Sequence, residues 1–296
     1  MSVAGGLPRA VERAVVHRCA ALQIFAKNAS QWRGRELPRE EIREFRARVK
    51  TAGIGPVVSH GSYLINLASA DPVLRRQSLD AMGDELDRAE ALGLLGVVLH
   101  PGAYTIGNEA DGLTLIADAL VTLLRERRRG KTMVLLENTA GQGTTLGATF
   151  EQLASIIAKT GDHRRVGVCL DTCHLLASGY DLCSSETYAA TFHQFGRLVG
   201  FERLKAFHMN DSKRPLGSRV DRHEHIGHGF LGLEPFRRIV NDRRFRHLPM
   251  LLETPKAEGK ATGPIAADPL DQKNLNTLRG LMERAGGAGR SGKAGE

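Results

Sequence analysis

The sequence has no apolar run approaching the roughly 20 residues that a membrane-spanning helix needs, which excludes an integral membrane protein of that type. It also lacks, at its start, the basic stretch followed by an apolar stretch that marks a secretory signal peptide, so we expect a cytoplasmic protein. Cysteine is scarce. The 296 residues include only Cys19, Cys169, Cys173 and Cys183, which fit reduced, mostly buried thiols better than a disulfide framework.

Charge is present in excess of one sign. The formal net charge is +8 at pH 7, which favours polyanionic partners, but only weakly. Part of the excess lies in "LLRERRRGK" at residues 123–131, a helical segment whose charges we interpret as a solvated face. Charge alone therefore leaves nucleic-acid binding and a plain globular protein equally open.

A repeated unit runs along the chain, in which a short apolar run is followed by a polar loop and an amphipathic helical pattern. The runs are "ALQIFA" (21–26), "GPVVSH" (55–60), "GVVLH" (96–100), "MVLLE" (133–137), "VGVCLD" (166–171), "LKAFHM" (204–209) and "PMLLE" (249–253). Helical patterns lie near 37–53, 71–93, 112–129, 149–160, 186–200, 233–242 and 271–285. Such near-continuous apolar strands are typical of a parallel sheet covered on both faces.

This alternation predicts an α/β fold of the TIM-type (β/α)₈ barrel class, with a doubly wound sheet as the alternative. A closed barrel needs eight strands and only seven runs can be counted, so we expect the first strand to be absent from this chain. We also expect one barrel domain over residues 1–285 and a disordered basic tail over residues 286–296.

Six of the seven runs end in a residue that can bind a metal ion. These residues are His60, His100, Glu137, Asp171, His208 and Glu253. In a barrel the carboxyl ends of all strands share one rim, where active sites lie, so these six side chains should converge. Nearby loops add His174, Asp221 and His223.

A single histidine at a strand end is more often structural than a ligand, but six coincidences on one rim favour a metal site. Several like-charged buried carboxylates cost many kcal/mol unless cations compensate them. A mixture of His, Asp and Glu suits zinc, or failing that manganese or iron. Cys169 and Cys173 flank Asp171, and we interpret both as packing residues rather than ligands.

Several stretches of the sequence together resemble those of one known protein family. "HGSYLINLA" (60–68), "GVCLDTCH" (167–174) and "HMNDSKRPLGSRVDRH" (208–223) resemble the three signature stretches of the endonuclease IV family of apurinic/apyrimidinic (AP) endonucleases. "QIFAKNASQW", "LHPGAY", "LLENTAGQG" and "LLETPK" are similar to that family too, in order and at fitting intervals.

The resemblance implies three zinc ions at the carboxyl-end rim of the barrel. One would be held by His60, His100 and Glu137. A second would share Glu137 and be completed by Asp171, His208 and Glu253. The third would be held by His174, Asp221 and His223. Catalytic roles would fall on Glu137, Asp171 and Glu253.

The implied activity is hydrolysis of the phosphodiester 5′ to an abasic site in duplex DNA, leaving a 3′-hydroxyl and a 5′-deoxyribose phosphate, together with removal of blocking groups from 3′ ends. Tyr63 and Leu64 match family residues that insert into the bent duplex. Ser30 stands where the family usually has an arginine, which puts one DNA contact in doubt. A monomer is expected.

Two other interpretations stay open. One is a metal-dependent sugar isomerase or epimerase on a related barrel, and the other is a DNA-binding protein that is inactive because a strand is missing. The chain begins "MSVAGGL", inside a stretch that in the family follows the first strand, so the true start could lie upstream. The sequence therefore predicts an open gap in the barrel between residues 21–26 and 249–253, with all nine candidate ligands still converging.

Overall fold

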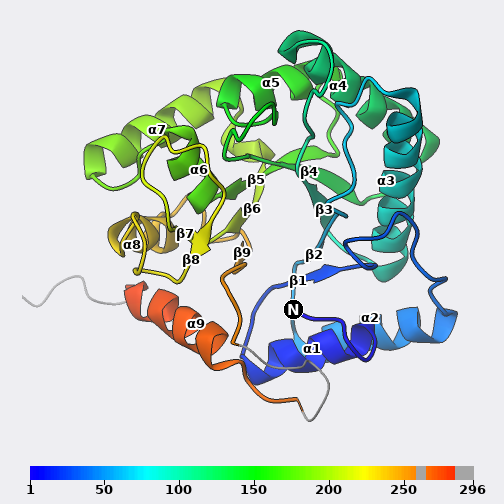
Figure 1. The fold of residues 1–296 in the computed structure, drawn as a ribbon. Helices are drawn as coiled ribbons and strands as arrows, with labels where there is room; N and C mark the ends of the chain where they lie inside the picture. The colour runs from blue at the N-terminus through cyan, green and yellow to red at the C-terminus, as the bar shows by residue number, and fades with distance from the viewer. Residues whose placement is uncertain (258–264, 284–296) are drawn as a thin grey trace, which may run out of the picture.

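Seven parallel strands form one sheet that curves into a nearly closed ring, with helices around its outside (Figure 1). The computed structural model describes residues 1–257 and 265–283. The ring follows chain order from β1 to β6 and ends with β9. Its strands are β1 (Leu22–Phe25), β2 (Val57–His60), β3 (Gly96–Leu99), β4 (Met133–Glu137), β5 (Val166–Asp171), β6 (Leu204–His208) and β9 (Met250–Leu251). All seven predicted strands are present, and the TIM-barrel prediction is confirmed.

The helices that follow the strands form the outer layer of the ring (Figure 1). They are α2 (Arg39–Ala52), α3 (Pro72–Leu92), α4 (Glu109–Glu126), α5 (Phe150–Lys159), α7 (Ser185–Leu198), α8 (Glu234–Asn241) and α9 (Pro269–Leu281). Local sequence signals set their ends. In α3, the Asp71 side chain caps the N-terminus, and Gly93 ends the helix with a φ of 73°, a left-handed conformation that glycine adopts without steric cost.

Three structured segments were missed by the sequence patterns. Helix α1 (Leu7–Val16) precedes the first strand, and the short helix α6 (Thr172–Ser178) follows β5 directly. Strands β7 (Asp211–Ser212) and β8 (His223–Glu224) pair antiparallel as a small second sheet. No helix in the described part of the chain is both long and apolar enough to cross a membrane. The expected tail at residues 286–296 lies outside the described residues.

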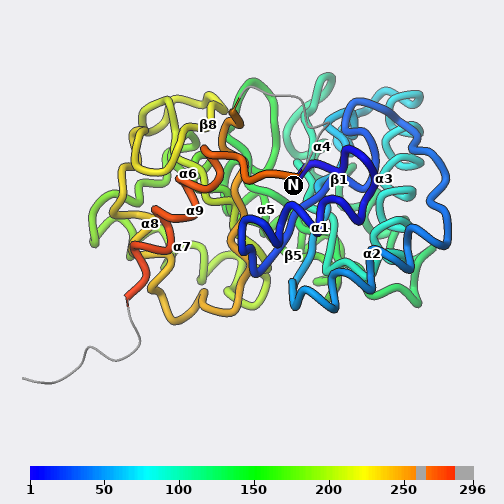
Figure 2. The backbone as a smooth tube through the Cα atoms, turned by 90° about the horizontal axis from the view of Figure 1, so that it is seen from below, coloured from blue at the N-terminus to red at the C-terminus, as the bar shows by residue number. Residues whose placement is uncertain are grey.

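Strands β1 and β9 are the two edges of the ring, and among the described residues no backbone pairing joins them. We call this gap the seam. It lies where the sequence predicted it, between residues 21–26 and 249–253. Helices α1 and α9 lie next to each other on this side of the molecule (Figures 1 and 2), where Nη2 of Arg279 on α9 donates to the carbonyl oxygens of His17 and Arg18 just after α1.

Candidate metal centre

The strand alternation explains why six predicted ligands converge. The barrel interior is filled by one apolar cluster, Val58, Val98, Leu135, Cys169, Ala206 and Leu251. Each of these residues stands two positions before one of the six strand-end ligands. Successive side chains of a strand point to opposite faces, so residues two apart share a face. The six ligands therefore form the next layer up inside the ring, at its carboxyl-end rim.

Glu137 lies at the middle of this layer and is fully buried. Its Oε2 is 3.1 Å from Nε2 of His60 and 3.2 Å from Nε2 of His100. Its Oε1 is 2.9 Å from Nδ1 of His208. One carboxylate thus faces two groups of ligands, one through each oxygen.

The second group forms around Nδ1 of His208. This nitrogen lies 3.2 Å from Oε2 of Glu253 and 3.9 Å from Oδ2 of Asp171. One candidate ligand atom from each of Glu137, Asp171, His208 and Glu253 falls within 4.8 Å of all the others, as is also true of His60, His100 and Glu137. The first two ligand sets implied by the resemblance are therefore assembled in space.

The third group depends on two of the segments that the sequence patterns missed, helix α6 and the β7–β8 pair. Helix α6 begins directly after Asp171, whose carboxylate accepts the backbone N–H of His174, and this turn brings His174 to the rim. Its Nε2 is 3.1 Å from Oδ2 of Asp221. Strand β8 carries His223, whose Nε2 is 3.3 Å from Oδ1 of Asp221 and 3.6 Å from Oδ2 of Asp171.

Three of the histidines are oriented by their other ring nitrogens. Nδ1 of His60, His174 and His223 faces the backbone carbonyls of Gly61, Asn138 and Glu253, at 2.8, 2.8 and 3.2 Å. In a neutral ring that donates from Nδ1 to a carbonyl, Nε2 carries the lone pair and is the nitrogen available to a cation. Metal-binding histidines usually donate their second N–H in this way.

Electrostatics show how strongly these groups depend on opposite charge. Burial alone would raise the pKa of Glu137, but the surrounding histidines, His208 foremost, hold it well below its usual value. Burial would lower the pKa of His174, yet the Asp171 carboxylate and other acidic neighbours raise it well above the ordinary value. Asp221, similarly opposed by burial, has its pKa lowered to about 2 by His174 and His223. The lowered pKa values keep Glu137 and Asp221 ionised, and buried ionised carboxylates require positive charge close by.

The side chains of His174, His223 and Asp221 are arranged more like ligands of a divalent cation than like a hydrogen-bonded cluster. Nε2 of His174 and of His223 is buried and finds no hydrogen-bond partner among the described residues, although carboxylate oxygens lie just over 3 Å away. Two ligands of one tetrahedral zinc ion, each about 2.1 Å from it, lie roughly 3.4 Å apart. This spacing and the two unpartnered nitrogens fit ligands of a cation. The groups whose atoms all lie within 4.8 Å join His174 and His223 with Asp171, and Asp221 with His223 and Cys173.

Two asparagines that sequence reasoning missed hold the carboxylates in place. Asn138 accepts the backbone N–H of Asp171 at 2.6 Å, and Asn210 donates its amide to Oδ2 of Asp171 at 2.6 Å. Asn210 also accepts the backbone N–H of Glu253 at 2.8 Å. Asn138 follows one candidate ligand directly and Asn210 stands two residues after another, a position that could have flagged them.

The glycine-rich "GHGFLG" stretch is a loop that folds around one buried carboxylate. The backbone N–H groups of Gly227, Gly229 and Leu231 all donate to Asp211 on β7, at 2.9 to 3.0 Å. A Cβ at Gly229 would clash with the carbonyl oxygen of Ser212, so the close approach itself requires glycine.

Both cysteines beside Asp171 are buried, as expected of packing residues. Cys169 belongs to the interior cluster of the barrel. Cys173 is less simple, because its sulfur lies within 4.8 Å of ligand atoms of Asp221 and His223. Burial raises its pKa to about 12, which disfavours the thiolate that would bind a metal.

The two residues expected to enter DNA lie beside this centre on the loop after β2. Tyr63 is 65% exposed, with its ring 5.5 Å from that of His60 and 5.7 Å from that of Phe25. Leu64 is half-buried next to it. Ser30, where an arginine was expected, is exposed on the loop after β1.

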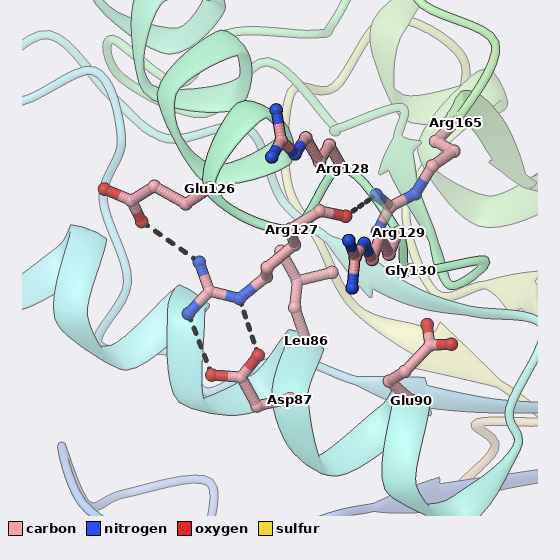
Figure 3. A pocket seen from close by; sticks show the side chains of 9 residues that line it. All are labelled: Leu86, Asp87, Glu90, Glu126, Arg127, Arg128, Arg129, Gly130 and Arg165. Atoms are coloured by element: carbon pink, nitrogen blue, oxygen red, sulfur yellow. Dashed lines mark hydrogen bonds and ion pairs between the residues drawn. The ribbon is translucent and has the colours of Figure 1, made fainter.

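A separate hollow of about 270 Å³ lies among arginines away from these residues (Figure 3). Arg127 contacts both carboxylate oxygens of Asp87, at 2.7 and 2.8 Å, and also reaches Glu126. Arg165 donates to the carbonyl of Arg127 at 2.6 Å. Arg127 follows the end of α4, where cations are favoured by the helix dipole. Most charged side chains of residues 123–131 are exposed, in agreement with their interpretation as a solvated face.

A family model described as a xylose isomerase-like TIM barrel matches residues 12–280. The chain is 50% identical over 283 residues to a protein of Chloroflexus aggregans named "Probable endonuclease 4", covering 95% of this chain and 96% of that protein. It is 46% identical over 284 residues to a protein of the same name from Geobacter sulfurreducens, covering 96% and 93%. The chain belongs to the endonuclease IV family. Within that family it is a nuclease of the hydrolase class.

Solved structures agree. Endonuclease IV from Thermus thermophilus superposes with a TM-score of 0.81 and 38% identity, covering 95% of this chain and 96% of that one. D-psicose 3-epimerase from Clostridium cellulolyticum H10 gives a TM-score of 0.66 at 17% identity, covering 95% and 94%, which shows the barrel fold alone. The recognition made from the sequence motifs is confirmed.

Proposed function

We propose that this endonuclease IV family member hydrolyses the phosphodiester 5′ to abasic sites in duplex DNA, leaving a 3′-hydroxyl and a 5′-deoxyribose phosphate, and that it also removes blocking groups from 3′ ends. The observation that carries the proposal is the convergence of nine His, Asp and Glu side chains at one rim, directly beside the exposed Tyr63. All nine come from one chain, which supports a monomeric enzyme. Its free cysteines fit a reducing cytoplasm.

Three divalent ions, zinc by preference, are proposed for this centre. His60, His100 and Glu137 would hold the first, and Glu137 would also contact the second with Asp171, His208 and Glu253. His174, Asp221 and His223 would hold the third. When bound, such ions act as Lewis acids toward a phosphodiester, lower the pKa of a water molecule to about 7 and balance the four carboxylates with a surplus of positive charge.

The chain's own residues prepare the centre for that chemistry. Glu137, Asp171 and Glu253 are the proposed catalytic carboxylates; the first two are buried and Glu253 is partly exposed. Neighbouring histidines lower the pKa of Glu137 and of Glu253, which keeps both unprotonated. The backbone carbonyls facing His60, His174 and His223 fix which ring nitrogen is available. Asn138 and Asn210 hold Asp171 from both sides, so little rearrangement is needed when a cation or substrate arrives.

Tyr63 and Leu64 are the proposed lesion readers. A protruding aromatic and an aliphatic side chain can fill the space of a missing base, and the unstacking this needs costs least at a damaged site. Ser30 offers no charge to a phosphate, and Lys27 nearby is buried in an internal ion pair and so is turned away from DNA. Arg33, a basic residue three positions after Ser30, is exposed and accessible to a phosphate.

A sugar isomerase or epimerase is the second candidate, because barrels of that class share the fold. The third ligand set, made of His174, Asp221 and His223, and the exposed Tyr63 favour the nuclease. An inactive DNA-binding variant is the remaining alternative, since the seam leaves two strand edges unpaired.

The test uses purified full-length protein and a duplex that carries a single tetrahydrofuran abasic analogue. Cleavage on the 5′ side, with a product that a polymerase extends directly, is the expected result. The metal content of the same sample should approach three ions per chain. Binding without cleavage would support the inactive variant, and ketose epimerisation without cleavage would support the sugar enzyme.

A further inference from the structure

His208 is anchored differently from the other oriented histidines of the centre. His60, His174 and His223 turn Nδ1 toward a backbone carbonyl and leave Nε2 toward the carboxylates. His208 does the reverse. Its Nδ1 faces Glu137, while its Nε2 lies 2.8 Å from Oε1 of Gln23. A backbone carbonyl is present whichever residue occupies the position, but the group that anchors His208 is the side chain of Gln23, which a substitution removes.

Gln23 occupies the position on β1 that corresponds to the ligands on the other six strands. Ala21, two residues before it, packs against the interior cluster of the barrel. By strand alternation Gln23 therefore points into the ligand layer. Six strands place a metal-capable residue in this layer, and β1, the strand at the edge of the seam, places an amide there.

The amide also contacts Glu253, at the opposite edge of the seam. Nε2 of Gln23 donates to Oε1 of Glu253, which lies two residues after β9. No backbone pairing joins β1 and β9 in the described part of the chain. At the rim, the Gln23 side chain links the β1 edge of the seam to Glu253 beyond the β9 edge by a hydrogen bond, although no backbone pairing joins the two strands.

The donor and acceptor roles follow from the carboxylate. An ionised carboxylate only accepts hydrogen bonds, so the Gln23 atom beside Glu253 must be the NH₂ group. The Gln23 oxygen then faces His208, which must donate from Nε2. In the neutral ring that a metal ion binds, the lone pair of His208 then lies on Nδ1, which faces Glu137 and Glu253 at 2.9 and 3.2 Å.

We propose that Gln23 is a positioning residue for the second metal set: its amide holds His208 in the Nε2–H tautomer and turns Oε2 of Glu253 into the site. This inference rests on the proposed metal-dependent function. It predicts that β1 controls one ion selectively, because the hydrogen bonds of the Gln23 side chain among the described residues go to Glu253 and His208, which both belong to the second set.

The experiment compares Gln23→Leu and Gln23→Glu with wild type, and Gln77→Leu on the exposed face of α3 serves as the matched control. Zinc affinity is measured by competition with a chromogenic chelator, and metal content by elemental analysis. Histidine tautomers are read from long-range ¹H–¹⁵N NMR spectra of the zinc-loaded protein. Outer partners of metal ligands typically contribute about 10- to 100-fold in affinity.

Gln23→Leu should weaken one of the three ions by about 10- to 100-fold, leave the other two, and alter the His208 ring signals. Gln23→Glu keeps the acceptor for His208 but loses the donor to Glu253. It should therefore retain the Nε2–H tautomer while still weakening that ion. Gln77→Leu should match wild type in every measurement.

Equal loss of all three ions in Gln23→Leu, or unchanged zinc affinity and His208 signals, would overturn the inference while leaving the proposed function in place. If Gln23→Leu fails to fold, the Gln23→Glu variant provides the test. A zinc affinity equal to that of wild type in Gln23→Glu would show that the hydrogen bond donated to Glu253 has no role. Wild-type protein that binds no metal would instead overturn the proposed function, and this inference with it.

Discussion

The ammonium of Lys27 and the carboxylate of Glu85 lie 3.6 Å apart, and each side chain is only 1% exposed. Lys27 also donates to the carbonyl oxygen of Trp32 at 2.7 Å, and Glu85 accepts the backbone N–H of Ser62 at 3.2 Å. The pair therefore ties the loop after β1 to the loop after β2, which carries Tyr63. The Lys27–Glu85 pair thereby helps to hold in place the two loops that are proposed to contact DNA.

Glu85 should make stability depend on pH in a definite direction. Burial, only partly offset by Lys27, raises its pKa from 4.5 to about 7. The folded state thus holds this proton more tightly than the unfolded state. The stabilisation is complete below about pH 4.5 and is lost as pH rises to about 7, on the order of 3 kcal/mol in all.

Glu85→Gln should remove that dependence. Its free energy of unfolding, relative to wild type, should rise by roughly 2–3 kcal/mol between pH 5 and pH 8. Urea denaturation across this range measures the difference, with Asp80→Asn, an exposed carboxylate on the same helix, as the control. A difference that stays constant with pH would show that Glu85 does not titrate in this window.

Glu137→Ala should release at least two ions and abolish nearly all cleavage, because Glu137 faces both the His60–His100 pair and His208. Elemental analysis and the cleavage rate on an abasic duplex measure the two effects. Glu186→Gln, an exposed carboxylate on α7, should leave both unchanged. Activity within a few-fold of wild type in Glu137→Ala would rule out the shared-ligand assignment.

Tyr63→Ala should weaken binding to abasic duplex about 5- to 100-fold, the range expected from losing one aromatic stacking partner. Binding to undamaged duplex should change little, because the exposed ring has no gap to fill there. Electrophoretic or fluorescence titrations at fixed salt give both affinities, with Val73→Ala as an exposed apolar control. Equal losses on the two duplexes would assign Tyr63 a structural role.

Asp211→Ala should lower the free energy of unfolding by about 2–4 kcal/mol, since it leaves the N–H groups of Gly227, Gly229 and Leu231 without their shared acceptor. Asp211→Asn keeps one acceptor oxygen, so its stability should fall between those of wild type and the alanine variant. Thermal denaturation in the presence of zinc makes the comparison. An alanine variant as stable as wild type would mean that water replaces the carboxylate at no cost.

Much of the centre could be predicted from the sequence because it is built at strand ends. The six strand-end ligands follow their apolar runs directly, and a parallel barrel leaves only one rim on which such residues can meet. The third group was less accessible. Its members sit on a seven-residue helix and a two-stranded hairpin, elements too short for any periodic pattern to reveal.

The sequence by itself determined the seven barrel strands, the six strand-end ligands and the position of the seam, because strand alternation and chain order follow from local pattern. Only the tertiary structure decided what holds that layer together. Gln23 lies 230 residues from Glu253 and 185 from His208, and the bonds between them form only after the ring has curved. The same is true of Lys27 and Glu85. The sequence around a polar residue in an apolar strand does not indicate which distant side chain it will contact, because that contact depends on how the strands are arranged in the folded barrel.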